Sequence, residues 1–127
     1  MTKRIITSEN APAPIGPYSH AVEINGMLFV SGQVGKHPQT GELVLSDITS
    51  ETKQVMENLK AILSKAGYSF ADVVKTTIFL SDMNNFAKVN EVYGSYFTGN
   101  YPARETVQVA KLPLNVNVEI SVIAVKA

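Results

Sequence analysis

Apolar side chains recur along the chain with two different spacings, and the longer spacing predicts a helix in the middle of the chain. From residue 48 to residue 66 they fall at alternating steps of four and three, which turns one face of an α-helix toward a core. These residues are Ile48, Thr52, Val55, Leu59, Ile62 and Ala66. Asp47 or Thr49 can cap the start of this helix, and Gly67 suits the left-handed position after its end.

The remaining apolar segments predict a second helix and six strands. A helix is expected at residues 84–97, where it buries Phe86, Val89, Tyr93 and Phe97. Strands are expected at residues 3–7, 20–24, 27–31, 73–80, 104–110 and 117–125. Asn25-Gly26 favours the positive φ angles of a type I′ turn, so the second and third strands should form a hairpin. The strand at 73–80 is apolar and β-branched, which is typical of a strand covered on both faces.

This order of elements, βββαβαββ, predicts an α+β fold with a single domain over residues 1–127. We expect a mixed sheet with both helices packed on one face. In the last strand one face is apolar and forms the natural seat for the helices: Val116, Val118, Ile120, Val122 and Ala124. The other face is only partly apolar, so we expect another subunit to cover it.

Polar positions in the last two strands indicate where a site lies. Arg104 and Thr106 alternate with Val107 and Val109. If these valines share the core face of the last strand, Arg104 and Glu119 lie together on the other, half-buried face.

Arg104 and Glu119 are the first candidates for chemistry. Arg104 follows the stiff segment Pro102-Ala103, and its guanidinium offers a fork of donors that matches a carboxylate. A solvated arginine paired with Glu105 is the alternative. Glu119, among apolar neighbours, lies at a wet cleft, pairs with a base such as Arg104, or has a raised pKa that lets it exchange protons near neutral pH.

Three further residues are weaker candidates. Tyr18 ends a proline-stiffened loop at residues 8–18, which can hold its hydroxyl over a pocket or simply pack it. Ser31 precedes Gly32, where the backbone can approach a ligand closely. Asn90, next to an expected core residue of the second helix, faces either a ligand or water.

Composition excludes several classes of function. Eleven basic residues balance eleven acidic ones, which argues mildly against nucleic acid and anionic membranes as partners and leaves room for a local basic patch. With 17% charged residues the surface is poorly charged, as expected of an oligomer. The chain has no cysteine, no apolar run of membrane-spanning length and no signal-like N-terminus, so we expect a cytoplasmic protein.

Known site motifs are absent as well. His20 and His37 lack the spacing of metal ligands, so no metal site is expected. The sequence contains no GxSxG elbow, P-loop or GxGxxG.

Seven stretches together resemble one family, RidA (also called YjgF). They are Asn10 to Tyr18, Ser31-Gly32-Gln33, Asn58 to Gly67, Val74 to Leu80, Phe86 to Tyr93, Tyr101 to Val107 and Val118-Glu119-Ile120. The resemblance implies a chorismate mutase-like fold and a homotrimer with a cleft at each subunit boundary. It also implies an enzyme that hydrolyses 2-iminobutanoate, 2-iminopropanoate and their enamines to 2-oxo acids and ammonia, without a cofactor.

Site roles follow from the same resemblance. Arg104 would bind the substrate carboxylate and Glu119 would orient a water. Tyr18, Ser31, Asn90 and the backbone of Thr106 would line the pocket. This sequence departs from the family's usual residues at Thr106, Ser121 and His20, and the last two are expected to tune the substrate range.

Two other functions stay open. A sensor of 2-oxo acids or amino acids, linked to isoleucine biosynthesis, would use the same pocket. An endoribonuclease or translation inhibitor is the other alternative, and the zero net charge weighs against it.

Overall fold

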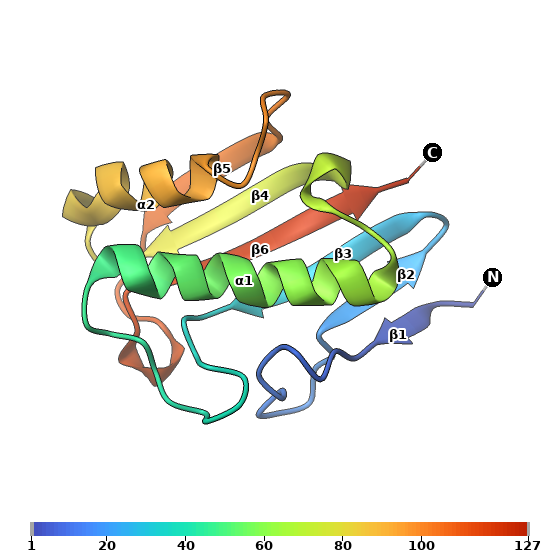
Figure 1. Cartoon of the computed structure of the whole chain (residues 1–127), viewed down its shortest axis with the longest axis horizontal. Helices are drawn as coiled ribbons and strands as arrows, with labels where there is room; N and C mark the ends of the chain where they lie inside the picture. Colours follow the sequence, from blue (N-terminus) through green and yellow to red (C-terminus); the bar gives the residue numbers. More distant parts are fainter. Residues whose placement is uncertain (1, 127) are drawn as a thin grey trace.

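The computed structural model describes residues 2–126 and confirms the expected order of strands and helices (Figure 1). The elements are β1 (Arg4–Ile6), β2 (Ala21–Ile24), β3 (Met27–Gln33), α1 (Ile48–Ala66), β4 (Val73–Leu80), α2 (Phe86–Gly94), β5 (Ala103–Gln108) and β6 (Val118–Val125). Three short 3₁₀ turns join them: η1 (Phe70–Asp72), η2 (Met83–Asn85) and η3 (Pro113–Asn115).

Helix α1 begins and ends where its sequence signals predict. The Asp47 carboxylate accepts a hydrogen bond from the Ser50 N–H at 2.7 Å, so Asp47 rather than Thr49 is the N-cap. Gly67 adopts a left-handed conformation with φ of 84°, and its N–H bonds back to the last turn. The apolar stripe faces the sheet and is buried, except for the partly buried Ile48 at its start.

The six strands form one sheet in the order β1-β2-β3-β6-β4-β5. Neighbours are antiparallel except β4 and β5, which run parallel, so the sheet is mixed. Asn25 and Gly26 have φ of 54° and 72°, the positive pair that a type I′ turn needs, and the β2–β3 hairpin is confirmed.

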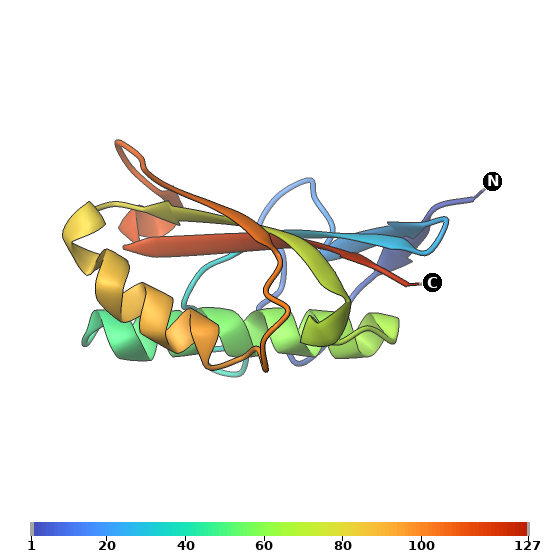
Figure 2. The same cartoon turned by 90° about the horizontal axis from the view of Figure 1, so that it is seen from above.

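Both helices lie on one face of this sheet, as predicted (Figure 2). The inward residues of β6 are buried against them, including Val118, Ile120 and Val122. The opposite, open face of the sheet has no helix and carries exposed apolar side chains such as Phe29 and Val107. The partly apolar helix-free face expected from the sequence is therefore present.

Two expectations about burial are wrong. Within one chain, strand β4 is covered on one face only: its burial alternates, and Val74 is about half exposed. Its apolar run reflects an open face that is itself partly apolar. Phe86 is exposed rather than in the core. It is the first residue of α2, and its ring contacts the Arg104 guanidinium of the edge strand β5 instead of the core.

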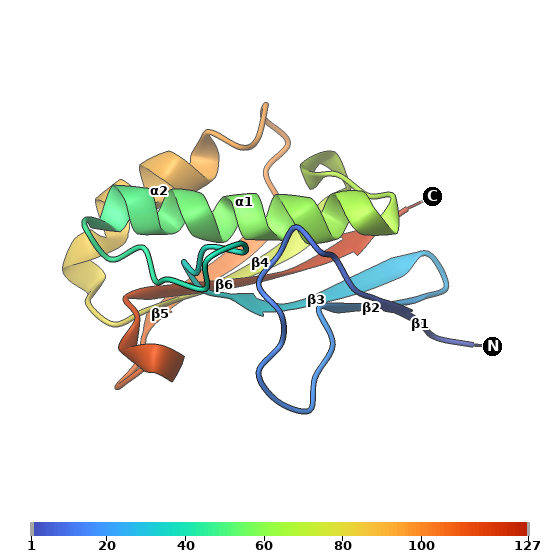
Figure 3. The same ribbon diagram turned by 60° about the horizontal axis from the view of Figure 1, so that its bottom comes forward.

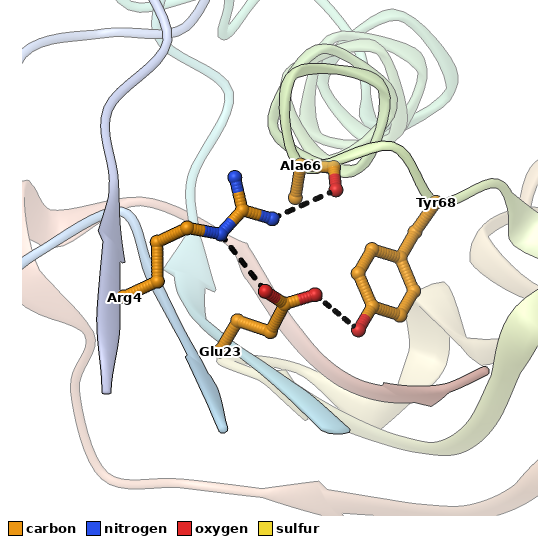
Figure 4. A network of polar contacts seen from close by, with 4 residues as sticks. All are labelled: Arg4, Glu23, Ala66 and Tyr68. Atoms are coloured by element: carbon orange, nitrogen blue, oxygen red, sulfur yellow. Dashed lines mark hydrogen bonds and ion pairs between the residues drawn. The ribbon is translucent and has the colours of Figure 1, made fainter. Parts of the chain in front are cut away.

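A polar network fastens the β1–β2 edge to the end of α1 (Figure 4). Arg4 donates through Nε to the Glu23 carboxylate at 2.8 Å and through Nη2 to the Ala66 carbonyl at 3.2 Å. The Tyr68 hydroxyl donates to the same carboxylate at 2.6 Å. Burial and this contact with Glu23 raise the pKa of Tyr68 to about 12. The network fixes the edge from which the loop at residues 8–18 starts and returns.

Candidate functional site

A cavity of about 500 Å³ opens beside the strand ends of β3 and β6. Its polar lining includes Tyr18, Ser31 and Glu119, three of the residues expected in the site. Its apolar lining comes from the loop at residues 8–18, from the residue after β3 and from η3, and consists of Pro12, Ala13, Ile15, Val34, Pro113 and Leu114. The tip of the 8–18 loop projects on the side of the sheet away from the helices (Figure 3). The site therefore combines a rigid strand wall with a wall made of loop.

Glu119 provides the acidic group of this cavity, whose lining also includes Lys36. Glu119 is the second residue of β6, lies on the open face opposite Phe79 of β4, and is half-buried. Burial raises the pKa of its carboxyl above the ordinary glutamate value. Within residues 2–126, no group donates a hydrogen bond to this carboxylate or forms an ion pair with it. A desolvated, unpaired carboxyl beside a cavity can take a proton from water and return it.

Gly32 makes room for that carboxyl. A Cβ added at Gly32 would lie 2.9 Å from the Glu119 Cδ, closer than real Cβ atoms come to other atoms. The sequence predicts that the backbone can approach a ligand closely at this glycine. In the structure it is the Glu119 side chain that approaches.

The two hydroxyls of the cavity differ in what they can still offer a ligand. The Ser31 hydroxyl donates to the Ser19 carbonyl at 2.6 Å, so it can only accept a further bond. The Tyr18 hydroxyl accepts a long bond of 3.4 Å from the Ile15 N–H, which leaves its own proton for a ligand. Tyr18 thus keeps a neutral donor for a ligand.

Arg104 does not line this cavity and instead packs against α2. Its guanidinium carbon is 5.6 Å from the ring centre of Phe86 and 5.2 Å from that of Tyr93. Nη1 donates to the Asn90 side-chain oxygen. Tyr93 is itself fixed, because its hydroxyl donates to Thr76 at 3.0 Å. Asn90 and the two rings thus orient the guanidinium, while its Nε and Nη2 donors stay available.

The expectation that Arg104 and Glu119 share a face is wrong. Arg104 pairs with Thr76, whose side chain is buried under the helices, whereas Glu119 pairs with Phe79 on the open face. The parallel register with β4 decides this, and it turns Val107 outward instead. An ion pair between the two groups is excluded within the chain, and Glu105 pairs with Lys75 at 3.1 Å rather than with Arg104.

The three departures from the family pattern lie outside the cavity. Thr106 faces the same side as Arg104, and its hydroxyl is buried without a partner among the described residues. Ser121 lies beside Thr77 on the open face. His20 is buried, and its ring bonds to the backbone of Ser8 and Pro12. Ser121 and His20 were expected to tune the substrate range, but neither residue lines the cavity.

A buried carboxylate that sequence reasoning missed holds the start of β6. Glu51 of α1 accepts hydrogen bonds from the Asn117 N–H and side-chain amide, both at 2.8 Å, and from the Val118 N–H at 3.3 Å. Gly35 packs against it, since a Cβ there would lie 2.8 Å from the Glu51 side chain. The last of these hydrogen bonds comes from Val118, one residue before Glu119. A glutamate in the first turn of a helix gives no sign of such a partner in sequence.

The described part of the chain has neither a metal-binding cluster nor a membrane-spanning helix. Residues 2–126 hold no group of three or more histidine, aspartate or glutamate residues that could bind a metal ion. None of their helices is both long and apolar enough to cross a membrane.

Comparison with known proteins gives consistent matches over almost the whole chain. A model of the family described as Endoribonuclease L-PSP matches residues 8–126. A RutC family protein of Pyrococcus horikoshii is 54% identical, over 98% of both chains. The 2-iminobutanoate/2-iminopropanoate deaminase of Mus musculus is 49% identical, over 98% of this chain and 92% of that protein. The crystal structure of E. coli TdcF with bound serine matches with a TM-score of 0.94 and 44% identity, over 98% and 99% of the two chains.

Proposed function

Since the chain belongs to the Endoribonuclease L-PSP family, the RidA or YjgF family, we propose that it is a deaminase that hydrolyses reactive 2-imino acids. The products are 2-oxo acids and ammonia, and the substrates are 2-iminobutanoate, 2-iminopropanoate and their enamine tautomers. In this proposal the protein acts in the cytoplasm and serves amino-acid metabolism. Three mammalian relatives, 44% to 49% identical, carry the name of this activity.

The observation that carries the proposal is the unpaired Glu119 carboxyl beside its cavity. Hydrolysis of an imine needs a group that removes a proton from water and delivers it to the departing nitrogen. Glu119 is desolvated, has a raised pKa and faces space rather than a partner. A structural carboxylate of this chain looks different: Glu51 receives three hydrogen bonds.

In the proposed reaction, Arg104 binds the substrate carboxylate through its free guanidinium donors. Glu119 accepts a proton from a water, whose oxygen forms a bond to the carbon of the C=N group. Glu119 passes this proton to the nitrogen, the hydroxyl of the resulting adduct gives up the second proton to the nitrogen as the C=O bond forms, and the C–N bond breaks to release ammonia. Tyr18 donates a hydrogen bond to the substrate or to this water. Water is the only co-reactant, and most of the acceleration comes from holding it near the imine carbon.

Two copies of the chain are needed to complete this site. Arg104 and Glu119 project from opposite faces of one sheet, so one small substrate cannot touch both within a chain. We propose a homotrimer in which Arg104, Asn90 and Thr106 of one subunit meet Tyr18, Ser31 and Glu119 of the next. The exposed apolar side chains of the open face, such as Phe29, Val107 and Val125, favour such an association.

The test is an assay of ammonia and 2-oxo acid release from imino acids that an amino-acid oxidase generates in place. Wild type should accelerate release, and Arg104→Ala and Glu119→Gln should each lower the rate by roughly 10²-fold or more, because each removes a group that orients the reactants. Glu105→Gln is the matched control, since this exposed carboxylate pairs with Lys75 on the other face of β5. An Arg104→Ala protein as active as wild type would sink the proposal.

A sensor of small amino or oxo acids is the second candidate, and the serine bound in the TdcF crystal structure favours it. The same cavity would then bind its ligand without turnover. Calorimetry with 2-oxobutanoate and serine separates the two functions: tight binding by a protein without hydrolytic activity supports the sensor. An RNA cleavage assay on the same sample tests the activity in the family's description.

A further inference from the structure

His20 is a buried histidine whose ring bonds to the loop that forms one wall of the cavity. His20 is 1% exposed. Nδ1 accepts a hydrogen bond from the Ser8 N–H at 3.0 Å, and Nε2 lies 2.7 Å from the Pro12 carbonyl oxygen. A backbone N–H only donates and a carbonyl only accepts. The ring is therefore neutral with its proton on Nε2, the one form that satisfies both partners.

These two bonds, together with the burial of Ala11 in the core, hold the first half of the loop. The other hydrogen bonds of residues 8–12 stay within the segment, from the Ala11 N–H to the Ser8 carbonyl and from the Asn10 N–H to the Ser8 hydroxyl. In the described part of the chain, no further hydrogen bond joins this segment to the sheet or helices. Prolines at 12, 14 and 17 remove three backbone donors from the loop.

The backbone of the same residue holds the strand wall. The His20 carbonyl accepts a hydrogen bond from the Ser31 N–H at 2.9 Å. His20 thus links both walls of the cavity: its ring fixes the segment that ends at Pro12, and its carbonyl fixes Ser31. Its own side chain does not line the cavity.

We infer that His20 is a positioning residue for the candidate site, setting where Pro12, Ile15 and Tyr18 stand relative to Ser31 and Glu119. The effect on catalysis rests on the proposed function, whereas the fixing of the loop does not. Two polar atoms of opposite kind are required at this position. Glutamine supplies them, because its side-chain oxygen accepts and its NH₂ group donates. Leucine has a similar size and supplies neither.

The first test compares His20→Leu with the conservative His20→Gln. His20→Leu should raise KM for a 2-imino acid about tenfold or more, because misplacing a contact by about 1 Å costs up to roughly 10²-fold. His20→Gln should keep KM within about twofold of wild type. The matched control is His37→Leu, since His37 also accepts backbone bonds, from Gln39 and Thr40, but lies outside the cavity.

The second test needs no enzymatic activity, so it separates the failure of this inference from failure of the proposed function. Hydrogen exchange should be faster for the Ser8 amide in His20→Leu than in wild type, and slow again in His20→Gln. In wild type, the ¹⁵N shifts of the His20 imidazole should show protonated Nε2 and bare Nδ1, a measurement that survives even if His20→Leu does not fold. A proton on Nδ1, or a glutamine variant as impaired as the leucine variant, overturns the inference.

Discussion

Arg104 and Glu119 project from opposite faces of the same sheet, although only β4 separates their strands. Arg104 is aligned with the buried Thr76 and Glu119 with Phe79 of the open face. A guanidinium and a carboxylate arranged in this way cannot act on one small molecule inside one chain. The proposed activity therefore belongs to an assembly, and this can be tested with inactive variants.

Mixed assemblies of Arg104→Ala and Glu119→Gln subunits should recover activity that neither variant has alone. In a cyclic trimer each site takes Arg104 from one subunit and Glu119 from the next, so every mixed trimer has one intact site, roughly a third of its sites. Coexpression with two affinity tags isolates the mixed assemblies for the imine assay. Arg104→Ala mixed with the double variant should stay inactive. Mixed assemblies no more active than their parents would mean that the site lies within one chain.

The stability of the protein should depend on pH through Glu119. Burial disfavours its charged form and raises its pKa in the folded state. The destabilisation is absent at acid pH, where the carboxyl is neutral in both states, and develops as pH rises through the raised pKa. Glu119→Gln should therefore be more stable than wild type at pH 7, and this gain should vanish near pH 3. Urea denaturation at the two pH values measures it, and Glu105→Gln should show no such gain.

Gly32→Ala should lower activity without unfolding the protein. The new methyl group would lie 2.9 Å from the Glu119 Cδ and would push the carboxylate out of place. We expect kcat/KM to fall by roughly 10²-fold, the cost of moving a reacting group by about 1 Å. Gly94→Ala is the control, because a Cβ there meets nothing within 4 Å. Equal kcat/KM for Gly32→Ala and wild type would show that the position of Glu119 is unimportant.

Much of the fold can be predicted from sequence because its signals are local. The caps Asp47 and Gly67 act within one turn of α1, and Asn25-Gly26 fixes its hairpin within two residues. Burial in β6 also follows from alternation, since this central strand has a helix layer on one side only.

The candidate site is predictable only in part, because its geometry depends on long-range pairing. Strand β5 carries polar residues on one face and valines on the other, and its sequence alone suggests that the valines face inward. The parallel register with β4 reverses this and puts Arg104 beneath α2. The roles of Phe86 and Glu51 were missed for the same reason: each acts on a residue far away in sequence.

Phe86→Leu should weaken substrate binding more than turnover. Its ring lies 5.6 Å from the Arg104 guanidinium carbon, and an exposed cation–π contact is worth about 0.5–1 kcal/mol. Its loss frees the guanidinium, so KM should rise about two- to fivefold with little change in kcat. Phe86→Tyr keeps an aromatic face and should behave as wild type. A leucine variant with unchanged KM would contradict this prediction and show that Asn90 and Tyr93 suffice to orient the Arg104 guanidinium.

Thr106→Val should stabilise the protein, which is unusual for a substitution at a half-buried strand position. The Thr106 hydroxyl is buried with no hydrogen-bond partner among the described residues, and leaving such a group unsatisfied costs about 1–3 kcal/mol. Valine has nearly the same shape and suits a strand, so the free energy of unfolding should rise by about 1 kcal/mol. Thr76→Val is the matched control and should be destabilising, because the Thr76 hydroxyl accepts a hydrogen bond from buried Tyr93. Urea denaturation measures both changes. If Thr106→Val is instead less stable than wild type, the hydroxyl has a partner in the assembled protein, and the neighbouring subunit must approach β5 closely enough to supply it.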